Sequence, residues 1–109
     1  MGKFEIRKTK SGQYKFDLKA SNGQVILSSE TYKSKASCKK GIHSVMNNAS
    51  EDKRFDRKTA KNGSPYFNMK ARNGQIIGTS EMYSNASGME NGIASVKKNA
   101  VDASIDDQS

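Results

Sequence analysis

The sequence predicts an α+β protein made of tandem β-β-β-α-β repeats with pseudo-two-fold symmetry, in which one shared antiparallel sheet carries both helices on one face. Two observations lead to this fold class. Residues 4–49 align with residues 55–100 without a gap, and 19 of the 46 pairs are identical. In each copy, apolar residues first alternate with polar ones, as in half-buried strands, and later recur at steps of three and four, as on one helical face.

The two copies are expected to form one compact domain over residues 1–109, with repeat 1 at 3–51, repeat 2 at 52–105 and a disordered tail at 106–109. A unit of about 50 residues buries too little surface to be stable alone without a disulfide or a metal. The single cysteine, Cys38, excludes an internal disulfide, and no Cys/His cluster offers a metal site. A shared core would make the chain an intramolecular version of a two-fold dimer, which predicts a monomer.

The first two strands of each copy form a hairpin. In repeat 1, apolar and charged residues alternate over 4–7 and 14–20. A three-residue loop at 10–12, with its glycine in the left-handed conformation, puts the apolar side chains of both strands on one face. A two-residue loop would instead set Ile6 against Asp17. The predicted pairs are Phe4 with Leu18 and Ile6 with Phe16.

A second hairpin closes at the Asn-Gly dipeptides 22–23 and 73–74. Asn-Gly favours a two-residue type I′ turn, because both of its central residues need positive φ. This turn sets Ala20 opposite Val25 and leaves Ile26, like its counterpart in repeat 2, on the outer face of the sheet.

A helix follows in each copy, after the N-cap residues Ser34 and Asn85. We expect the helices to end near Asn48 and Asn99 in a left-handed cap conformation. A glycine stands in the middle of both helices, where it costs about 1 kcal/mol relative to alanine. The repeated glycine indicates that a strand or the sister helix packs closely there. The alternation over 101–105 predicts a short closing strand.

These residues resemble the YegP-like family of small bacterial proteins of unknown function. The resemblance rests on the paired segments NGQxI…SExY, on the helix ends GIHSVMNNA and GIASVKKNA, and on the stretch KTAKNGSPYFNMKARNGQIIG. It covers the chain up to Ala100. It implies that the two units form a single sheet and exchange their last strands. Members have no assigned activity, so the resemblance implies no catalytic residues.

Composition narrows the classes of function. No run of 18 apolar residues and no signal-peptide pattern occur, so we expect a soluble, cytoplasmic protein without membrane contact. The net charge is +8, and residues 1–50 carry +7 of it against +1 for residues 51–109. This balance raises the possibility of a nucleic-acid partner.

The best candidates for a functional site are two polar pairs that occupy equivalent positions in the two repeats. They are Glu30 with Tyr32, and Glu81 with Tyr83. A carboxylate and a phenol two residues apart could serve acid/base chemistry. No nucleophile or histidine partners them, so we favour a structural role, with the glutamates before a helix N-terminus and the tyrosines anchoring the strand-to-helix corner.

The remaining reactive residue types also favour structural roles. His43, the single histidine, has Ala94 as its counterpart and is expected on a helix surface, while Cys38 is expected to be a buried thiol. Phosphate-loop, metal-protease and CxxC motifs are lacking. We therefore expect no enzyme activity, no cofactor and no bound metal.

The leading hypothesis is a non-catalytic, soluble binding or interaction module with an unknown ligand or partner. The alternative is weak, largely non-specific nucleic-acid binding through the open sheet face. Glu5, Asp17 and Asp56 would interrupt the positive charge of that face. A third possibility is peptide capture along an exposed edge strand. The candidate residues of the open face are Arg7, Lys15, Lys19, Lys58, Tyr66 and Lys70.

Overall fold

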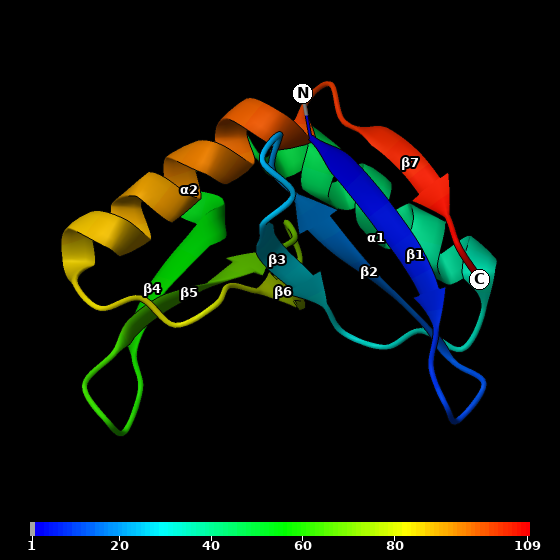
Figure 1. Cartoon of the computed structure of the whole chain (residues 1–109), viewed down its shortest axis with the longest axis horizontal. Helices are drawn as coiled ribbons and strands as arrows, with labels where there is room; N and C mark the ends of the chain where they lie inside the picture. Colours follow the sequence, from blue (N-terminus) through cyan, green and yellow to red (C-terminus); the bar gives the residue numbers. More distant parts are fainter. Residues whose placement is uncertain (1) are drawn as a thin grey trace.

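The computed structural model describes residues 2–109, and both repeats contribute to one sheet within that range (Figure 1). The seven described strands follow the order β4-β5-β6-β3-β2-β1-β7. The central pair is β3 with β6, antiparallel, with Ser28 opposite Thr79 and Ser29 opposite Gly78. The elements are β1 (Lys3–Lys8), β2 (Tyr14–Lys19), β3 (Val25–Ser29), α1 (Lys35–Asn48), the 3-10 helix η1 (Asp52–Arg54), β4 (Phe55–Thr59), β5 (Pro65–Lys70), β6 (Ile76–Thr79), α2 (Ala86–Ala100) and β7 (Ser104–Asp107).

The first hairpin forms as predicted. Thr9 N donates to Gln13 O at 2.7 Å across a three-residue loop, and Gly12 has φ of 83°. The predicted registers, Phe4 with Leu18 and Ile6 with Phe16, are confirmed. The hydrophobic pattern and the turn glycine therefore agree on one register.

The second hairpin differs from the prediction. Its loop has three residues, because Ala20 N donates to Gln24 O at 2.9 Å and only Gly23 has positive φ, at 85°. Asn22 keeps a negative φ, and its side-chain oxygen accepts from Gln24 N at 3.0 Å. This side-chain bond stabilises a turn that needs one left-handed residue instead of two. The type I′ turn was therefore the wrong prediction.

A β-bulge follows from that turn. Lys19 pairs with Val25 and Leu18 pairs with Leu27, so one extra residue, Ile26, is accommodated in β3. Ile26 is thereby buried beside α2 instead of standing on the outer face, and Ile77 is buried beside α1 in the same way; each is 7% exposed. The prediction that these isoleucines lie on the open face is wrong.

Both helices begin at the predicted caps. The Ser34 hydroxyl accepts from Ser37 N at 3.1 Å, and Asn85 Oδ1 accepts from Gly88 N at 2.7 Å. The helices end at Asn48 and Ala100, near the predicted positions, but the predicted left-handed cap is wrong, because no non-glycine residue among 2–109 has positive φ. Asn48 and Asn99 instead each donate to the carbonyl oxygen of the serine four residues earlier, which holds the side chain against the helix.

The two helices cover the same face of the sheet, and each packs on strands of both repeats. α1 contacts β2 and β6, and α2 contacts β5, β3 and β2. The phenylalanines meet edge to face within each repeat, with centroids 5.6 Å apart for Phe4–Phe16 and for Phe55–Phe67. Buried apolar residues of both repeats form one cluster, so the core is shared.

One edge of the sheet is parallel, so the sheet is mixed and not purely antiparallel. β7 lies parallel to β1, with Phe4 opposite Ile105. The last strand of repeat 2 therefore pairs with repeat 1, which is half of the exchange that the family resemblance implies. The predicted closing strand of repeat 1 is wrong, because the chain after α1 forms η1 and continues into β4. The strand runs to Asp107, and Gln108 N donates to Ile6 O at 2.9 Å. Residues 106–109, expected as a disordered tail, thus begin within a paired strand.

The opposite edge, β4, has no strand beside it among residues 2–109. The segment after α1 forms η1 and continues directly into β4. Arg57 occupies the position that Ile6 has in repeat 1, and its guanidinium donates to Glu90 at 2.9 Å and to Asp52 at 3.1 Å. Ile6, which lies next to β7, is fully buried. The missing strand explains why repeat 2 has a charged residue here.

Candidate functional site

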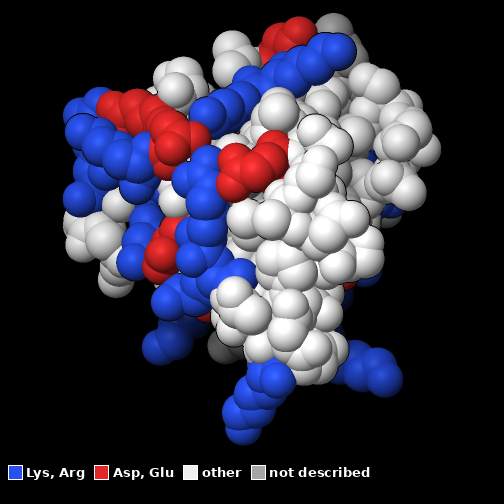
Figure 2. Space-filling view, turned by 90° about the vertical axis from the view of Figure 1, so that its left-hand side faces the viewer, with Lys and Arg blue, Asp and Glu red and all other residues white. Residues whose placement is uncertain are grey.

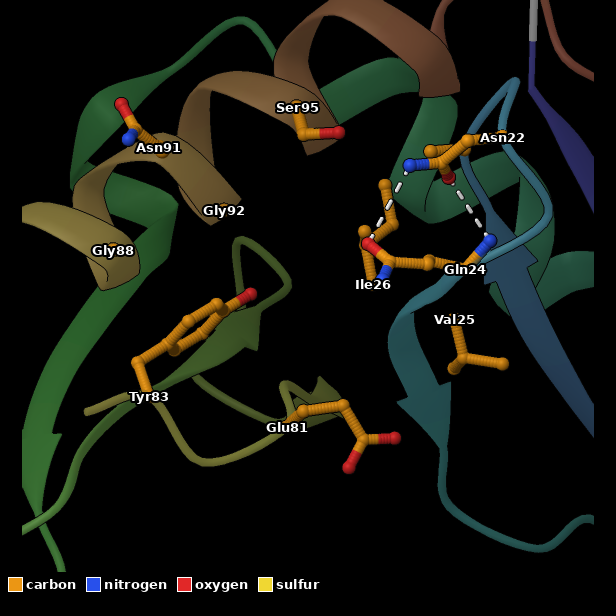
Figure 3. Close-up of a pocket in the computed structure, with 11 residues that line it drawn as sticks. Asn22, Gln24, Val25, Ile26, Glu81, Tyr83, Gly88, Asn91, Gly92 and Ser95 are labelled. Carbon is orange, nitrogen blue, oxygen red and sulfur yellow. Dashed lines mark hydrogen bonds between the residues drawn. The ribbon is translucent and has the colours of Figure 1, made fainter.

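Two clefts lie where one repeat meets the other. The α2-side cleft, about 460 Å³ in volume, lies between the β2–β3 turn of repeat 1 and the Glu81–Tyr83 segment and α2 of repeat 2 (Figure 3). The α1-side cleft, about 820 Å³, lies between the β5–β6 turn of repeat 2 and the Glu30–Tyr32 segment and α1 of repeat 1. Each cleft therefore needs both repeats. The α2-side lining is Ala20, Asn22, Gln24, Val25, Ile26, Glu81, Tyr83, Gly88, Asn91, Gly92 and Ser95.

The clefts are related by the internal repeat. All 11 residues that line the α2-side cleft have their counterpart, 51 positions away, in the lining of the α1-side cleft. The repeated segment 22–32 serves both clefts. Its first part, Asn22 to Ile26, lines the α2-side cleft, and its last part, Glu30 to Tyr32, lines the α1-side cleft.

The tyrosine of each cleft packs tightly beneath the helix that follows it in the chain. Tyr83 stacks on Phe67 with ring centroids 6.4 Å apart, and a Cβ at Gly92 would collide with its hydroxyl and lie 2.6 Å from its Cζ. Tyr32 and Gly41 repeat this arrangement. The close packing predicted from the mid-helix glycines is thus present, and the neighbour is this tyrosine.

Burial raises the pKa of both tyrosine hydroxyls above their ordinary value, with smaller contributions from nearby groups. A phenol with a raised pKa stays protonated at neutral pH, where it can donate a hydrogen bond but is a poor base. The packing and the pKa direction both agree with the anchoring role expected for Tyr32 and Tyr83.

The glutamates of the same segments behave differently. Glu30 and Glu81 are exposed, and in the described part of the chain neither carboxylate has a hydrogen bond or an ion pair. In Figure 3, Glu81 extends below Tyr83 toward Val25, whereas Asn22 and Gln24 bond to each other within the β2–β3 turn, on the other side of the cleft. Each cleft therefore combines a free carboxylate, a half-buried phenol, amide groups and an aliphatic wall.

Neither Cys38 nor His43 lines either of the two clefts. Burial raises the pKa of the Cys38 thiol to about 11, and the side chain is fully buried. His43 is exposed on α1, as expected. No group of three or more His, Cys, Asp or Glu in this range could hold a metal ion. Over the same residues, neither helix has the length and apolar character needed to cross a bilayer.

The sheet face opposite the helices contains the six candidates for nucleic-acid contact, but carboxylates pair with most of its cations. Glu5 accepts from Lys19 at 3.0 Å, which lowers the pKa of Glu5 despite burial. Asp56 accepts from Lys70 at 3.1 Å. Figure 2 shows positive and negative side chains interspersed on the side of the molecule that carries β4 and α2. The remaining pairs of the open face are Arg7 with Asp17 and Lys58 with Asp56.

Lys15 and Tyr66 are the candidates of that face without a carboxylate partner among the described residues. Lys15 lies opposite Arg7, and Tyr66 lies opposite Lys58. The six candidates thus share one face, but their charges are largely compensated, which weakens a continuous positive field.

An α+β fold of two tandem units, which share a sheet and a core, defines a class of small repeat proteins without defining a reaction. The chain matches the domain of unknown function DUF1508 twice, at residues 9–56 and 60–107, and it belongs to that family. The two matches begin 51 positions apart, as the repeats do.

The relatives extend over nearly the whole chain. A UPF0339 protein of Acinetobacter baylyi is 52% identical over 106 residues, which cover 97% of this chain and 96% of the relative. YegP of Escherichia coli K12 is 51% identical over the same shares. The predicted resemblance to the YegP-like family is confirmed.

Two solution NMR structures share the fold. That of E. coli YegP, described as a protein of unknown function, has a TM-score of 0.94 at 50% identity and covers 98% of this chain and 92% of its own. That of a UPF0339 protein of Shewanella oneidensis has a TM-score of 0.92 at 48% identity, with coverages of 97% and 90%. These names assign no activity, so the function of this family is unknown.

Sequence reasoning found half of each cleft. It selected the Glu–Tyr pairs but neither the residues across from them, Asn22, Gln24 and Ile26 with their counterparts, nor the helix residue Ser95 with its counterpart. The available signal was the concentration of identical pairs between 20 and 32. That signal cannot show which ends of the segment face each other across the repeat boundary.

Proposed function

We propose that this protein is a non-catalytic binding module whose two ligand sites are the clefts between the repeats. The observation that carries the proposal is the distribution of identities between the repeats. Eight of the 11 lining pairs are identical, compared with 11 of the other 35 aligned pairs. The repeats have diverged least where both clefts require the same side chains.

The lining supports a small, polar ligand with an apolar part. Volumes of about 460 and 820 Å³ fall in the usual range for small-molecule sites. The free carboxylates of Glu30 and Glu81 can accept from an amine, an amide or a hydroxyl, and the tyrosine hydroxyls can donate. Val25 and Ile26, with their counterparts, supply apolar contact. Nothing in this set activates a nucleophile, which supports binding instead of turnover.

The test is an NMR titration of the ¹⁵N-labelled full chain with a defined panel of amino acids, polyamines, sugars and nucleotides. A ligand of the proposed kind shifts the amides of Gln24, Glu81 and Gly92 together with those of their counterparts. Glu81→Gln should weaken binding at the α2-side cleft and Glu30→Gln at the α1-side cleft. Asp102→Asn, at an exposed carboxylate that has no ion pair among residues 2–109, is the matched control and should have no effect.

Two outcomes would contradict the proposal. Ligands whose shifts map away from both clefts would remove the clefts as binding sites. Chemical conversion of a panel member, abolished by Glu30→Gln or Glu81→Gln, would show that the module is catalytic.

A second, weaker proposal is non-specific nucleic-acid binding through the open face. It is supported by Lys15 and Tyr66, a cation and an aromatic ring without carboxylate partners in the described structure. Phosphate contacts are strongest at low salt, so the test is a shift of mixed DNA or RNA at about 50 mM salt. No shift under that condition would exclude this proposal.

A further inference from the structure

The two clefts differ in charge at one end. We propose that the α1-side cleft binds the anionic group of a small ligand, a phosphate or a carboxylate, in an adjoining basic groove on α1. This inference rests on the proposed binding function and names the ligand class of one of its two sites. The basic groove, about 680 Å³ in volume, is lined by Lys40, His43, Ser44, Asn47, Asn48 and Arg72.

The basic groove continues the α1-side cleft. Lys40 and Ser44 line both, so a ligand in the cleft can extend into the groove. Lys40, His43 and Asn47 lie three and four residues apart, which puts them along one face of α1. Arg72 approaches from the β5–β6 turn of repeat 2. An anion between α1 and this turn would therefore receive donors from both repeats.

The two cations of the groove are available to a ligand. Lys40 has no ion pair or hydrogen bond to any residue from 2 to 109. Arg72 is 76% exposed, and its nearest carboxylate oxygen, on Glu51, is 3.9 Å away. The other oxygen of Glu51 already accepts from Arg54 at 2.7 Å. In this respect the groove differs from the open face, where carboxylates hold most of the lysines and arginines.

The pseudo-equivalent groove beside α2 lacks these cations. Asn91, Ala94 and Ser21 stand where Lys40, His43 and Arg72 stand, and the volume is about 350 Å³. Its lysine, Lys98, is the counterpart of Asn47. The six lining positions of the basic groove all have their counterparts in this second groove, so the two grooves differ in charge and in volume at equivalent positions of the fold.

A small anion fits the groove better than a polynucleotide. The cations converge on one hollow from two elements and do not follow a line of phosphates, which a nucleic acid requires. Ser44 and Asn47 add neutral groups that can bond an oxyanion. The same chemistry would suit a phosphate ester or a polycarboxylate, so the probes must separate these sources.

The test is a titration of the ¹⁵N-labelled full chain at about 50 mM salt, where screening is weak. The probes are ADP, ribose 5-phosphate and citrate, with adenosine as the uncharged control. At least one of these anions should shift the amides of Lys40, His43, Ser44 and Arg72. A response to the two phosphate probes alone identifies a phosphate, a response to citrate alone identifies a carboxylate, and a response to all three means that the groove accepts both. The counterparts of these residues beside α2 should not shift.

Two variants with the same loss of charge provide the control. Lys40→Asn installs the residue of repeat 2 and should weaken binding of the anion by about tenfold or more, as expected for the loss of one charged hydrogen bond. Lys98→Asn installs the residue of repeat 1 in the other groove and should leave the affinity unchanged. Asn91→Lys should create a new anion response at Ser95.

Several results would overturn the inference. An equal loss in Lys40→Asn and Lys98→Asn would show that the anion responds only to the net charge of the chain. The inference also fails if no anion shifts the groove at about 10 mM, well above a typical KM range. If a single-stranded DNA 12-mer binds the same residues more tightly than every small anion, the partner is a nucleic acid. If cleft ligands bind but no anion does, the proposed function stands and only this inference is lost.

Discussion

The Tyr83 hydroxyl lies directly under Gly92, where any side chain on the helix would collide with it. Tyr32 and Gly41 have the same relationship in repeat 1. Glycine is a poor helix former, but because it has no Cβ it leaves room for the tyrosine of the strand-to-helix segment to pack against the helix. This contact positions the adjoining glutamate at the mouth of each cleft.

Gly92→Ala should destabilise the protein in spite of the better helix propensity of alanine. The gain is about 1 kcal/mol, whereas overpacking against a buried ring costs about 1–3 kcal/mol. Gly88→Ala is the matched control in α2, because its Cβ would meet nothing closer than 3.4 Å and should stabilise. Urea unfolding measures both changes in free energy.

The contact itself is tested by a double-mutant cycle. In a Tyr83→Ala background, Gly92→Ala should lose its penalty because the colliding ring is gone. An unchanged penalty would show that the cost comes from some other neighbour of Gly92.

Residues 1–51 expressed alone should not fold. α1 would lose its contact with β6, and β3 would lose β6 as its neighbour on one side while keeping β2 on the other. Circular dichroism and the dispersion of an NMR spectrum report the outcome. A cooperatively unfolding, dispersed fragment would contradict the idea that the repeats depend on a shared core.

Arg57→Ile should promote self-association. The substitution removes the pairs with Glu90 and Asp52 and leaves an apolar residue on β4, which has a free edge within the described part of the chain. Sedimentation at increasing concentration should then show species larger than the monomer, which the wild-type chain should not form. A strictly monomeric variant would mean that the charges do not protect this edge.

The reverse exchange tests the other edge. Ile6→Arg puts a charge at a fully buried position next to β7 and should destabilise by more than about 3 kcal/mol. We therefore expect an exchange between isoleucine and arginine to be tolerated at position 57 but not at position 6. Urea unfolding of both variants measures the two changes in stability.

Acid should weaken the charge cluster at β4. Hydrogen bonds from Arg57 and then from Lys97 lower the pKa of Asp52 to about 2 from an ordinary 3.8. Because the folded-state pKa is the lower one, this stabilisation is present above the ordinary pKa and is lost as the pH falls through the folded value. The Tm difference between wild type and Asp52→Asn should therefore be largest near pH 5 to 7 and shrink toward pH 2. Asp102→Asn should show no such trend.

Local signals determined much of the fold. The alternation around Phe4 and Phe16, together with Gly12, specified a register, and Ser34 and Asn85 specified where the helices begin. Each of these signals acts over a few residues through sterics and hydrogen bonds. The failures came where two local choices compete. The Asn-Gly turn admits either a two- or a three-residue loop, and burial of Ile26 through a bulge is consistent with the latter.

Local patterns in the sequence were enough to identify the duplication, the elements of each repeat apart from the closing strand expected in repeat 1, the buried faces of the helices and the Glu–Tyr pairs as candidates. Tertiary structure alone decided that each pair faces the turn of the other repeat, that β7 runs parallel to β1, and that Lys40 and Arg72 share a groove. The physical reason is the range of the interactions. Turns and caps are encoded by neighbouring residues, whereas contacts across the repeat boundary depend on how two apolar faces close over one core.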